Sequence, residues 1–210
     1  MPAVTSSSGP VAVTGASGYI GAHTIISLLQ RGYDVRACVT DLSNPNKTGF
    51  LKRLNGQYDG SITLHQANLL EAGSYDDIFA ECSAVLHVGQ PMGYAGNNSP
   101  QEVYDGSVGG ITNITGSINK VGTIKRLVYT SSFAAIAHPA APGHKFTEGD
   151  WASDNREGDI QWNTDNLVNK GEVGYAMGKV KCEHHINRSA EENGGYEAIS
   201  VNPCVVLGPL

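Results

Sequence analysis

Long apolar runs are missing from this chain: no segment approaches the roughly 20 consecutive apolar residues that a membrane-spanning helix needs. The first ten residues are rich in serine and lack the basic-then-apolar order of a secretion signal. We therefore expect a flexible leader over 1–10 and a cytoplasmic protein. Positive charge is also scarce. The formal net charge of −6 argues against nucleic acid or an anionic membrane as the main partner.

Cysteine is rare as well, and its positions are scattered. Cys38, Cys82, Cys182 and Cys204 form no Cys-x-x-Cys pair and no His/Cys cluster at the spacing of a zinc site. We expect buried, reduced thiols and no metal site.

Glycine, in contrast, is abundant, and three of the 26 glycines form a pattern. Gly15, Gly18 and Gly21 follow the apolar run 11–13 and open a helical apolar pattern. Glycines allow a tight turn and close approach to a ligand, and a helix N-terminus presents N–H groups and a partial positive charge to a diphosphate. This position between a strand and a helix predicts a dinucleotide-binding turn rather than a turn without a ligand.

Short β-branched runs alternate with helical patterns along the rest of the chain. We predict strands at 11–14, 34–39, 62–66, 84–88, 126–131 and 198–202, and helices near 19–31, 74–81, 101–121 and 172–193. This alternation predicts an α/β fold, a Rossmann-type doubly wound parallel sheet in three α/β/α layers, as one domain over 11–210. The long polar stretch 138–171 is expected to be an excursion beside the site.

Ligands bind outside the carboxyl ends of the strands in such sheets. A second motif lies within the predicted helix near 172–193: Tyr175 and Lys179 are four residues apart, on one face of that helix. A nearby ammonium favours phenolate and lowers a phenol pKa from about 10, which suits proton transfer in carbonyl chemistry. The strand 126–131 ends in hydroxyls, so a serine there can hydrogen-bond a substrate oxygen.

With these motifs in order, the chain resembles the extended short-chain dehydrogenases/reductases, most closely the group of dihydroflavonol reductase and cinnamoyl-CoA reductase. The resemblance covers 11–209. The segments that match the family are the glycine turn, Ala67-Asn68-Leu69, His87-Val88-Gly89-Gln90-Pro91-Met92, the segment 126–132, the Tyr/Lys pair and the segment 202–209.

The resemblance implies a role for each matching residue. Tyr175 is implied as the proton donor, Lys179 as the residue that lowers its pKa and holds the ribose hydroxyls, and Ser132 as the carbonyl-orienting serine, with Ser131 as its alternative. Substrate is expected against Gln90, Met92, Ser132, Phe133 and Tyr175. Cofactor is expected against Gly15, Ser17, Gly18, Tyr19, Ile20, Gly21, Asn68, Leu69, Val88, Gly89, Gln90, Ser131, Tyr175, Lys179, Pro203 and Val205.

The chain also departs from the family pattern. Asn68 replaces an aspartate that touches the adenine, and Ser107 stands where many relatives have the asparagine of a proton relay. An acidic residue that would select NAD is missing at Val39, and Thr40 follows where related enzymes have arginine. We expect Arg36, Thr40 and Lys47 to form a modest phosphate site, opposed by Asp41, and NADP(H) to be favoured over NAD(H).

Extended family members continue past the sixth strand into a smaller substrate lobe. Because the sequence ends at Leu210, we expect that lobe to be missing and the chain to be part of a longer polypeptide. The predicted function is NADP-dependent reduction of a ketone or aldehyde, by a monomer or homodimer. A nucleotide-sugar epimerase or dehydratase with bound NAD and a non-catalytic dinucleotide sensor remain alternatives; Ser132, Tyr175 and Lys179 argue against the sensor.

Overall fold

The computed structural model describes residues 4–91, 99–137, 141–152 and 170–209, which form a six-stranded sheet. The strands are β1 (Val11–Thr14), β2 (Val35–Val39), β3 (Ile62–Gln66), β4 (Ala84–His87), β5 (Arg126–Thr130) and β6 (Glu197–Val201). Their order is β3-β2-β1-β4-β5-β6, and all neighbouring pairs are parallel. The predicted parallel sheet is confirmed.

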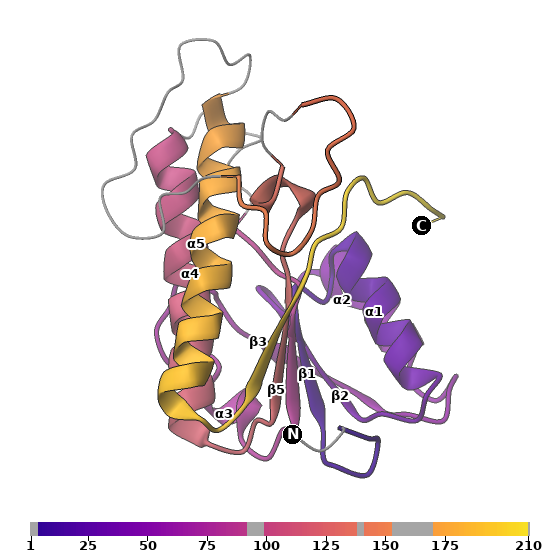
Figure 1. The fold of residues 1–210 in the computed structure, drawn as a ribbon. Coiled ribbons are helices and arrows are strands. Elements are labelled where there is room, and N and C mark those ends of the chain that lie inside the picture. The colour runs from indigo at the N-terminus through magenta and orange to yellow at the C-terminus, as the bar shows by residue number, and fades with distance from the viewer. Residues whose placement is uncertain (1–3, 92–98, 138–140, 153–169, 210) are drawn as a thin grey trace.

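Helices cover both faces of this sheet (Figure 1). One face carries α1 (Tyr19–Leu29) and α2 (Pro45–Arg53); the other carries α3 (Asp76–Phe79), α4 (Pro100–Val121) and α5 (Lys170–Asn193). A short 3-10 helix, η1 (Phe133–Ala135), follows β5. The predicted three-layer architecture is confirmed, whereas α2 is a helix that the sequence analysis missed.

The helix ends have clear local causes. Ser99 and Glu102 form a reciprocal capping box at the start of α4, and Gly122, with a φ of 65°, ends that helix in the left-handed region. At α2, the Asn44 side chain accepts a hydrogen bond from the Asn46 N–H, and Pro45 occupies the first helical position. This cap is a sequence signal that could have revealed α2.

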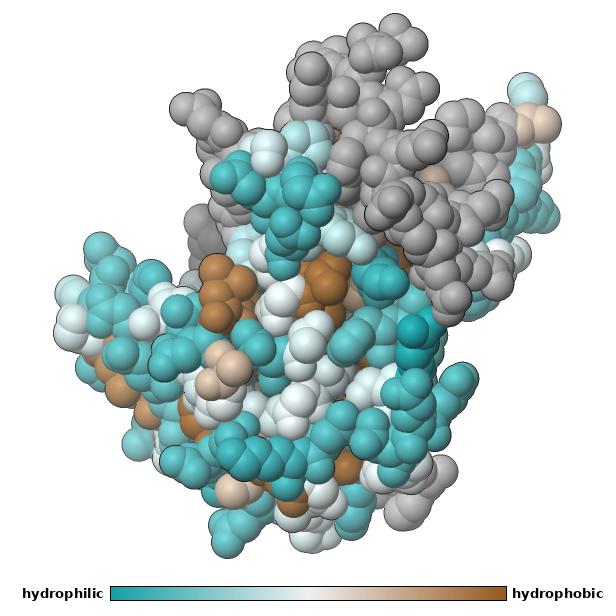
Figure 2. Space-filling view, turned by 90° about the vertical axis from the view of Figure 1, so that its left-hand side faces the viewer, coloured by the Kyte–Doolittle hydropathy of each residue, from teal (hydrophilic) through white to brown (hydrophobic). Residues whose placement is uncertain are grey.

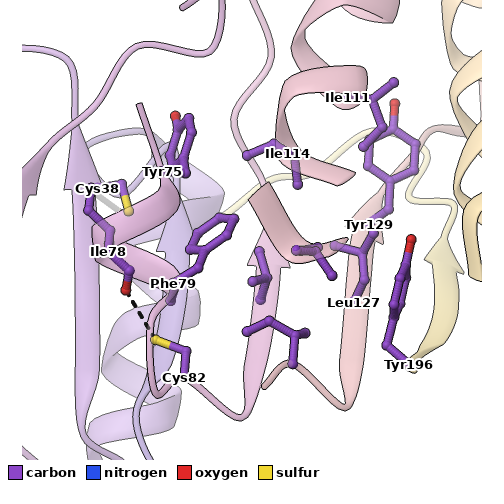
Figure 3. Close-up of a cluster of buried hydrophobic side chains, with 14 of the residues drawn as sticks. Cys38, Tyr75, Ile78, Phe79, Cys82, Ile111, Ile114, Leu127, Tyr129 and Tyr196 are labelled. Carbon is purple, nitrogen blue, oxygen red and sulfur yellow. Dashed lines mark hydrogen bonds between the residues drawn. The ribbon is translucent and has the colours of Figure 1, made fainter. Parts of the chain in front are cut away.

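Two hydrophobic clusters hold the layers together. Phe79, Ile111 and Leu127 belong to the cluster between the sheet and α3, α4 and α5, and all three are fully buried (Figure 3). Ile25 and Leu51 belong to the cluster under α1 and α2. The outer face on the α4 and α5 side is mostly hydrophilic, with small separate hydrophobic areas (Figure 2). These helices therefore pack by one face and expose the other.

Part of the predicted leader is attached to the domain. The Tyr33 hydroxyl donates to the Val4 carbonyl at 3.1 Å, and the Ser83 N–H donates to the Pro10 carbonyl at 2.8 Å. Residues 4–10 are thus not simply a flexible extension. Within the described ranges, no helix is long and apolar enough to cross a bilayer.

The cysteines fall into two classes. Cys38, Cys82 and Cys182 are buried, and burial raises the pKa of each thiol. The Cys82 thiol donates to the Ile78 carbonyl at 3.3 Å (Figure 3). Cys204 is exposed, so the expectation of buried thiols is wrong for this residue. It follows β6, where the chain has left the sheet.

Candidate functional site

A cleft of about 500 Å³ opens at the carboxyl ends of the strands. It lies where the strand order reverses, between β1 and β4, as expected for a ligand site in a doubly wound sheet. Its wall brings together most residues predicted for the cofactor. The lining residues are Gly15, Gly18, Tyr19, Ile20, Gly21, Val88, Gly89, Gln90, Thr130, Ser131, Ser132, Tyr175, Lys179, Pro203, Cys204 and Val206.

The three glycines of the turn serve different purposes. Gly15 has a φ of +67°, and a Cβ at this position would lie 2.5 Å from the Gly89 Cα. A Cβ at Gly21 would lie 2.2 Å from the Gly15 carbonyl oxygen, so the fold itself requires both glycines. A Cβ at Gly18 would meet only the Gly15 oxygen, at 3.3 Å. Gly18 therefore leaves room for a ligand in front of the turn.

Helix α1 begins directly behind this turn. Gly18 is its N-cap residue and provides no side-chain hydrogen bond. The first N–H groups of a helix have no partner within the helix, and together with the helix dipole they favour an anion. The glycine turn and α1 thus form a cradle suited to a diphosphate.

A buried threonine and histidine fix the two loops that meet in the cleft. Thr14 Oγ1 accepts a hydrogen bond from the Gly89 N–H at 3.2 Å and lies 2.7 Å from His87 Nδ1. The His87 ring stacks on Tyr129 with its centre 5.6 Å away. Burial, and to a smaller extent the nearby Lys179 charge, lower the pKa of His87 to about 3, so the imidazole is neutral.

The second motif is assembled on α5. Lys179 is buried; its Nζ donates to the Thr130 carbonyl at 2.7 Å and lies 4.7 Å from the Tyr129 ring centre and 5.5 Å from that of Tyr175. Burial lowers the pKa of Lys179 to about 8, against the raising effects of Cys182 and Glu183. The lysine therefore keeps its positive charge at neutral pH, beside the Tyr175 ring.

The two candidate serines differ in what their hydroxyls do. Ser131 is buried and donates to Glu183 Oε1. Ser132 lines the cleft, and its Oγ accepts a hydrogen bond from the Ala134 N–H at 3.1 Å. No acceptor for the Ser132 hydroxyl proton occurs in the described part of the chain. This arrangement favours Ser132 over Ser131 as the serine that meets a ligand.

Gln90 and Ser107, the second of which departs from the family pattern, form one contact. The Ser107 hydroxyl donates to the Val103 carbonyl at 2.8 Å, so it can only accept from Gln90 Nε2, which lies 3.0 Å away. Gln90 Oε1 is buried and has no partner among the described residues. The Ser107 hydroxyl thus already donates one hydrogen bond and accepts another from the Gln90 amide, which argues against a role for it in a proton relay.

The predicted phosphate site is only partly assembled. Lys47 Nζ hydrogen-bonds Thr40 Oγ1, and both residues lie around the start of α2, beyond the end of β2. Arg36, however, donates to the Ile78 and Ala80 carbonyls at 2.8 and 2.6 Å and pairs with Glu81 at 3.7 Å. Its guanidinium supports the end of α3, so the assignment of Arg36 to the cofactor is corrected.

Several other predicted residues lie outside the cleft wall. Ser17 is exposed beside the turn, and Val205 is 78% exposed while its neighbours Cys204 and Val206 line the cleft. The Asn68 side chain accepts a hydrogen bond from the Leu70 N–H at 3.1 Å. The Leu69 carbonyl accepts one from Asn113 on α4 at 2.8 Å.

The predicted excursion and its surroundings are described in part. The ring of Phe133 packs edge-on against Phe146, with centres 5.6 Å apart. Met92 and much of 138–171 lie outside the described residues. Over the described ranges, no group of three or more His, Cys, Asp and Glu side chains is arranged to hold a metal ion. Thr130, Cys204 and Val206 line the cleft although the sequence analysis did not include them.

The position of Cys204 leads to a direct prediction. A polar thiol reagent should modify a single cysteine in the native protein and all four after denaturation, because the other three thiols are buried. Since Cys204 lines the cleft, a ligand bound there should slow its modification. A Cys204→Ser variant that still reacts rapidly in the native state would contradict the burial of Cys38, Cys82 and Cys182.

Known proteins share both the sequence and this fold. The chain is 34% identical over 202 residues to dihydroflavonol 4-reductase of Hordeum vulgare, covering 96% of this chain and 54% of that protein. It is 33% identical over 201 residues to cinnamoyl-CoA reductase CAD2 of Medicago truncatula, covering 95% of this chain and 58% of that protein. The structure of Gre2 from Candida albicans in complex with NADPH aligns with a TM-score of 0.76 and 27% identity, over 95% of this chain and 59% of that one.

The chain thus spans between about half and three fifths of the length of these relatives. The model of the NAD dependent epimerase/dehydratase family matches residues 11–210, a range that contains the whole sheet and the cleft. The resemblance to the extended short-chain dehydrogenases/reductases, and to the group of dihydroflavonol and cinnamoyl-CoA reductases, is confirmed. The chain belongs to the NAD dependent epimerase/dehydratase family.

Proposed function

We propose that this protein is an NADP(H)-dependent reductase that converts a ketone or aldehyde into an alcohol. The observation that carries the proposal is the meeting of Ser132, Tyr175 and Lys179 in the cleft that also holds the glycine cradle. A hydroxyl donor, an ionisable phenol and a buried cation are the groups that carbonyl reduction needs beside a dinucleotide. Dihydroflavonol 4-reductase of Hordeum vulgare and cinnamoyl-CoA reductase CAD2 of Medicago truncatula are both reductases by name, which supports the same reaction type here.

The cleft residues fit a nicotinamide dinucleotide. The open space in front of Gly18 and the start of α1 suit the diphosphate, and Lys179 is assigned to the ribose hydroxyls. Thr40 and Lys47 would hold a 2′-phosphate. When bound, the cofactor supplies the hydride.

The chain's own groups manage the proton. The Ser132 hydroxyl donates a hydrogen bond to the substrate carbonyl oxygen and orients it. Tyr175 then gives its phenolic proton to the same oxygen as negative charge develops there. The ammonium of Lys179, which is fixed by the Thr130 carbonyl, stabilises the phenolate that remains.

An assay of cofactor oxidation tests this function against the alternatives. NADPH and NADH would be supplied with a panel of aldehydes, ketones and flavonoid-type carbonyls. The proposal expects NADPH-dependent turnover of at least one class. An epimerase would instead be purified with tightly bound NAD and would not consume added cofactor, and a sensor would bind dinucleotide without turnover.

Cofactor preference can be altered at Thr40, which is exposed. Val39 is only 3% exposed, so an aspartate there would disturb the core, and Thr40→Asp is the better probe. We expect Thr40→Asp to lower the affinity for NADPH about 10- to 100-fold, because its carboxylate repels the 2′-phosphate. Thr40→Arg should raise the affinity for NADPH through paired hydrogen bonds to that phosphate. Fluorescence titration of NADPH and NADH measures both effects.

Thr40→Ser is the matched control for this series and should bind NADPH like the unaltered protein, since it keeps the hydroxyl that contacts Lys47. NADH affinity should change little in all three variants. Equal losses of NADPH and NADH affinity in Thr40→Asp would contradict a 2′-phosphate site at this position.

A further inference from the structure

Helix α5 presents a third polar residue on the face that carries Tyr175 and Lys179. Glu183 follows Lys179 by four residues, so the three side chains lie on successive turns of one face. Glu183 is 6% exposed. A carboxylate that deeply buried needs hydrogen-bond partners, because losing its hydration is costly. Its partners therefore indicate what it does.

Glu183 Oε1 accepts two hydrogen bonds from the strand ends next to the cleft. One comes from the Ser131 hydroxyl, and the other from Asn202 Nδ2 at 2.7 Å. Asn202 Nδ2 also donates to the Ser132 carbonyl at 3.1 Å. Through this short network, a residue of α5 contacts the serine segment after β5 and the first residue after β6.

Lys179 completes the attachment of α5 to the same segment. Its Nζ donates to the Thr130 carbonyl, while Glu183 binds the Ser131 side chain and Asn202 binds the Ser132 carbonyl. Three consecutive residues at the end of β5 are thus held by hydrogen bonds that involve α5 directly or through Asn202. The distance between Ser132 and Tyr175 depends on these bonds, because Tyr175 is on α5 and Ser132 is not.

Glu183 does not itself line the cofactor cleft. It lines a separate cavity of about 550 Å³ together with Phe146, Trp151, Asn187 and Ser200. It therefore acts on a ligand in the cleft through neighbouring residues and not by direct contact.

We propose that Glu183 and Asn202 are positioning residues, which fix the hydroxyl of Ser132 relative to Tyr175 and Lys179 on α5. This inference rests on the proposed reductase function. It assigns a role to two residues that neither the cleft wall nor the catalytic motifs include.

The charge of Glu183 gives the network a second effect. Lys179 is faced by His87 from β4, by Tyr129 from β5, and by Tyr175, Cys182 and Glu183 from its own helix. His87 is neutral, and burial raises the pKa of Cys182 to about 11 and that of Tyr129 well above its usual range. Glu183 is thus the counter-charge that favours the protonated lysine at neutral pH.

Two substitutions separate the hydrogen bonds from the charge. Glu183→Gln keeps an acceptor oxygen for Ser131 and Asn202 but removes the charge, whereas Glu183→Leu removes both. We expect Glu183→Leu to lower kcat about 10- to 100-fold, because small misplacements of reacting groups are costly, while the NADPH dissociation constant changes less than about threefold. Asn202→Ala should lower kcat in the same manner.

The pH dependence tests the charge. NADPH affinity of the unaltered protein should fall as pH rises through the pKa of Lys179, about 8, because the lysine then loses its proton. Removing a neighbouring negative charge disfavours the ammonium, so in Glu183→Gln the midpoint should move down by about 0.5 to 1 pH unit. This readout does not depend on turnover, and a merely structural role would not produce it.

Glu191→Gln is the matched control, since Glu191 is an exposed residue of the same helix. It should leave kcat and the pH midpoint unchanged. Tyr175→Phe, measured alongside, tests the proposed function separately. The positioning role is overturned if Glu183→Leu keeps the normal kcat and Glu183→Gln keeps the pH midpoint of the unaltered protein. If Tyr175→Phe is inactive in the same experiments, the reductase function still stands. If Glu183→Leu fails to fold, Asn202→Ala and the Glu183→Gln midpoint decide the question.

Discussion

Replacing Tyr175 with phenylalanine is expected to lower turnover by about two to four orders of magnitude, the usual contribution of general acid–base catalysis. The substitution removes only the hydroxyl. The ring that Lys179 Nζ approaches to 5.5 Å remains, so NADPH affinity should stay within about threefold of the unaltered protein. Steady-state reduction of the best substrate gives the first quantity, and fluorescence titration of NADPH gives the second.

Tyr33→Phe provides the control for this substitution. The Tyr33 hydroxyl donates to the Val4 carbonyl, and the residue is not part of the cleft wall, so its loss should leave turnover unchanged. Near-normal turnover of Tyr175→Phe would show that another group supplies the proton.

The glycine turn should respond very differently at two of its positions. Gly21→Ala places a methyl group 2.2 Å from the Gly15 carbonyl oxygen, and both atoms belong to a rigid backbone turn. We expect a loss of about 3 kcal/mol in the free energy of unfolding, as for severe overpacking, together with loss of NADPH binding. Thermal unfolding and NADPH titration measure the two effects.

Gly18→Ala is the matched variant. Gly18 has a φ of −80°, which alanine adopts readily, and the new Cβ would lie 3.3 Å from the Gly15 carbonyl oxygen, a tight contact that a small shift can relieve. The free energy of unfolding should therefore fall by about 1 kcal/mol, much less than in Gly21→Ala, while the methyl group narrows the space for the diphosphate and weakens NADPH binding about tenfold or more. A Gly18→Ala protein with unaltered NADPH affinity would argue against a ligand in front of this turn.

The sheet was predictable because its strands are short runs with β-branched residues, of which β1, β2 and β4 are mostly buried, and because their spacing leaves room only for parallel connections. Each predicted strand agrees with the structure to within one residue at either end. Helix α2 was missed because only Thr48 and Leu51 of its nine residues are buried, which gives no clear apolar period. The cap formed by Asn44 and Pro45 was the better signal there.

The cleft was predictable where a motif and a strand end coincide, as at Gly18, Gly89 and Ser132. Arg36 was misassigned because sequence shows that a cation is near a strand but not which helix will bind its guanidinium. The bonds of Glu183 to Ser131 and Asn202 join residues from three elements, a pairing that only the fold creates. In the sequence, only the four-residue spacing of Glu183 from Lys179 indicated that Glu183 lies on the same helix face as the Tyr/Lys pair.

The most direct test of the cleft as an NADP(H) site is fluorescence titration of NADPH and NADH into the protein at neutral pH. We expect saturable binding of one NADPH per chain, tighter than that of NADH, through the turn at Gly18 and the residues Thr40, Lys47 and Lys179. An absence of saturable NADPH binding, or equal or tighter binding of NADH, would contradict this expectation.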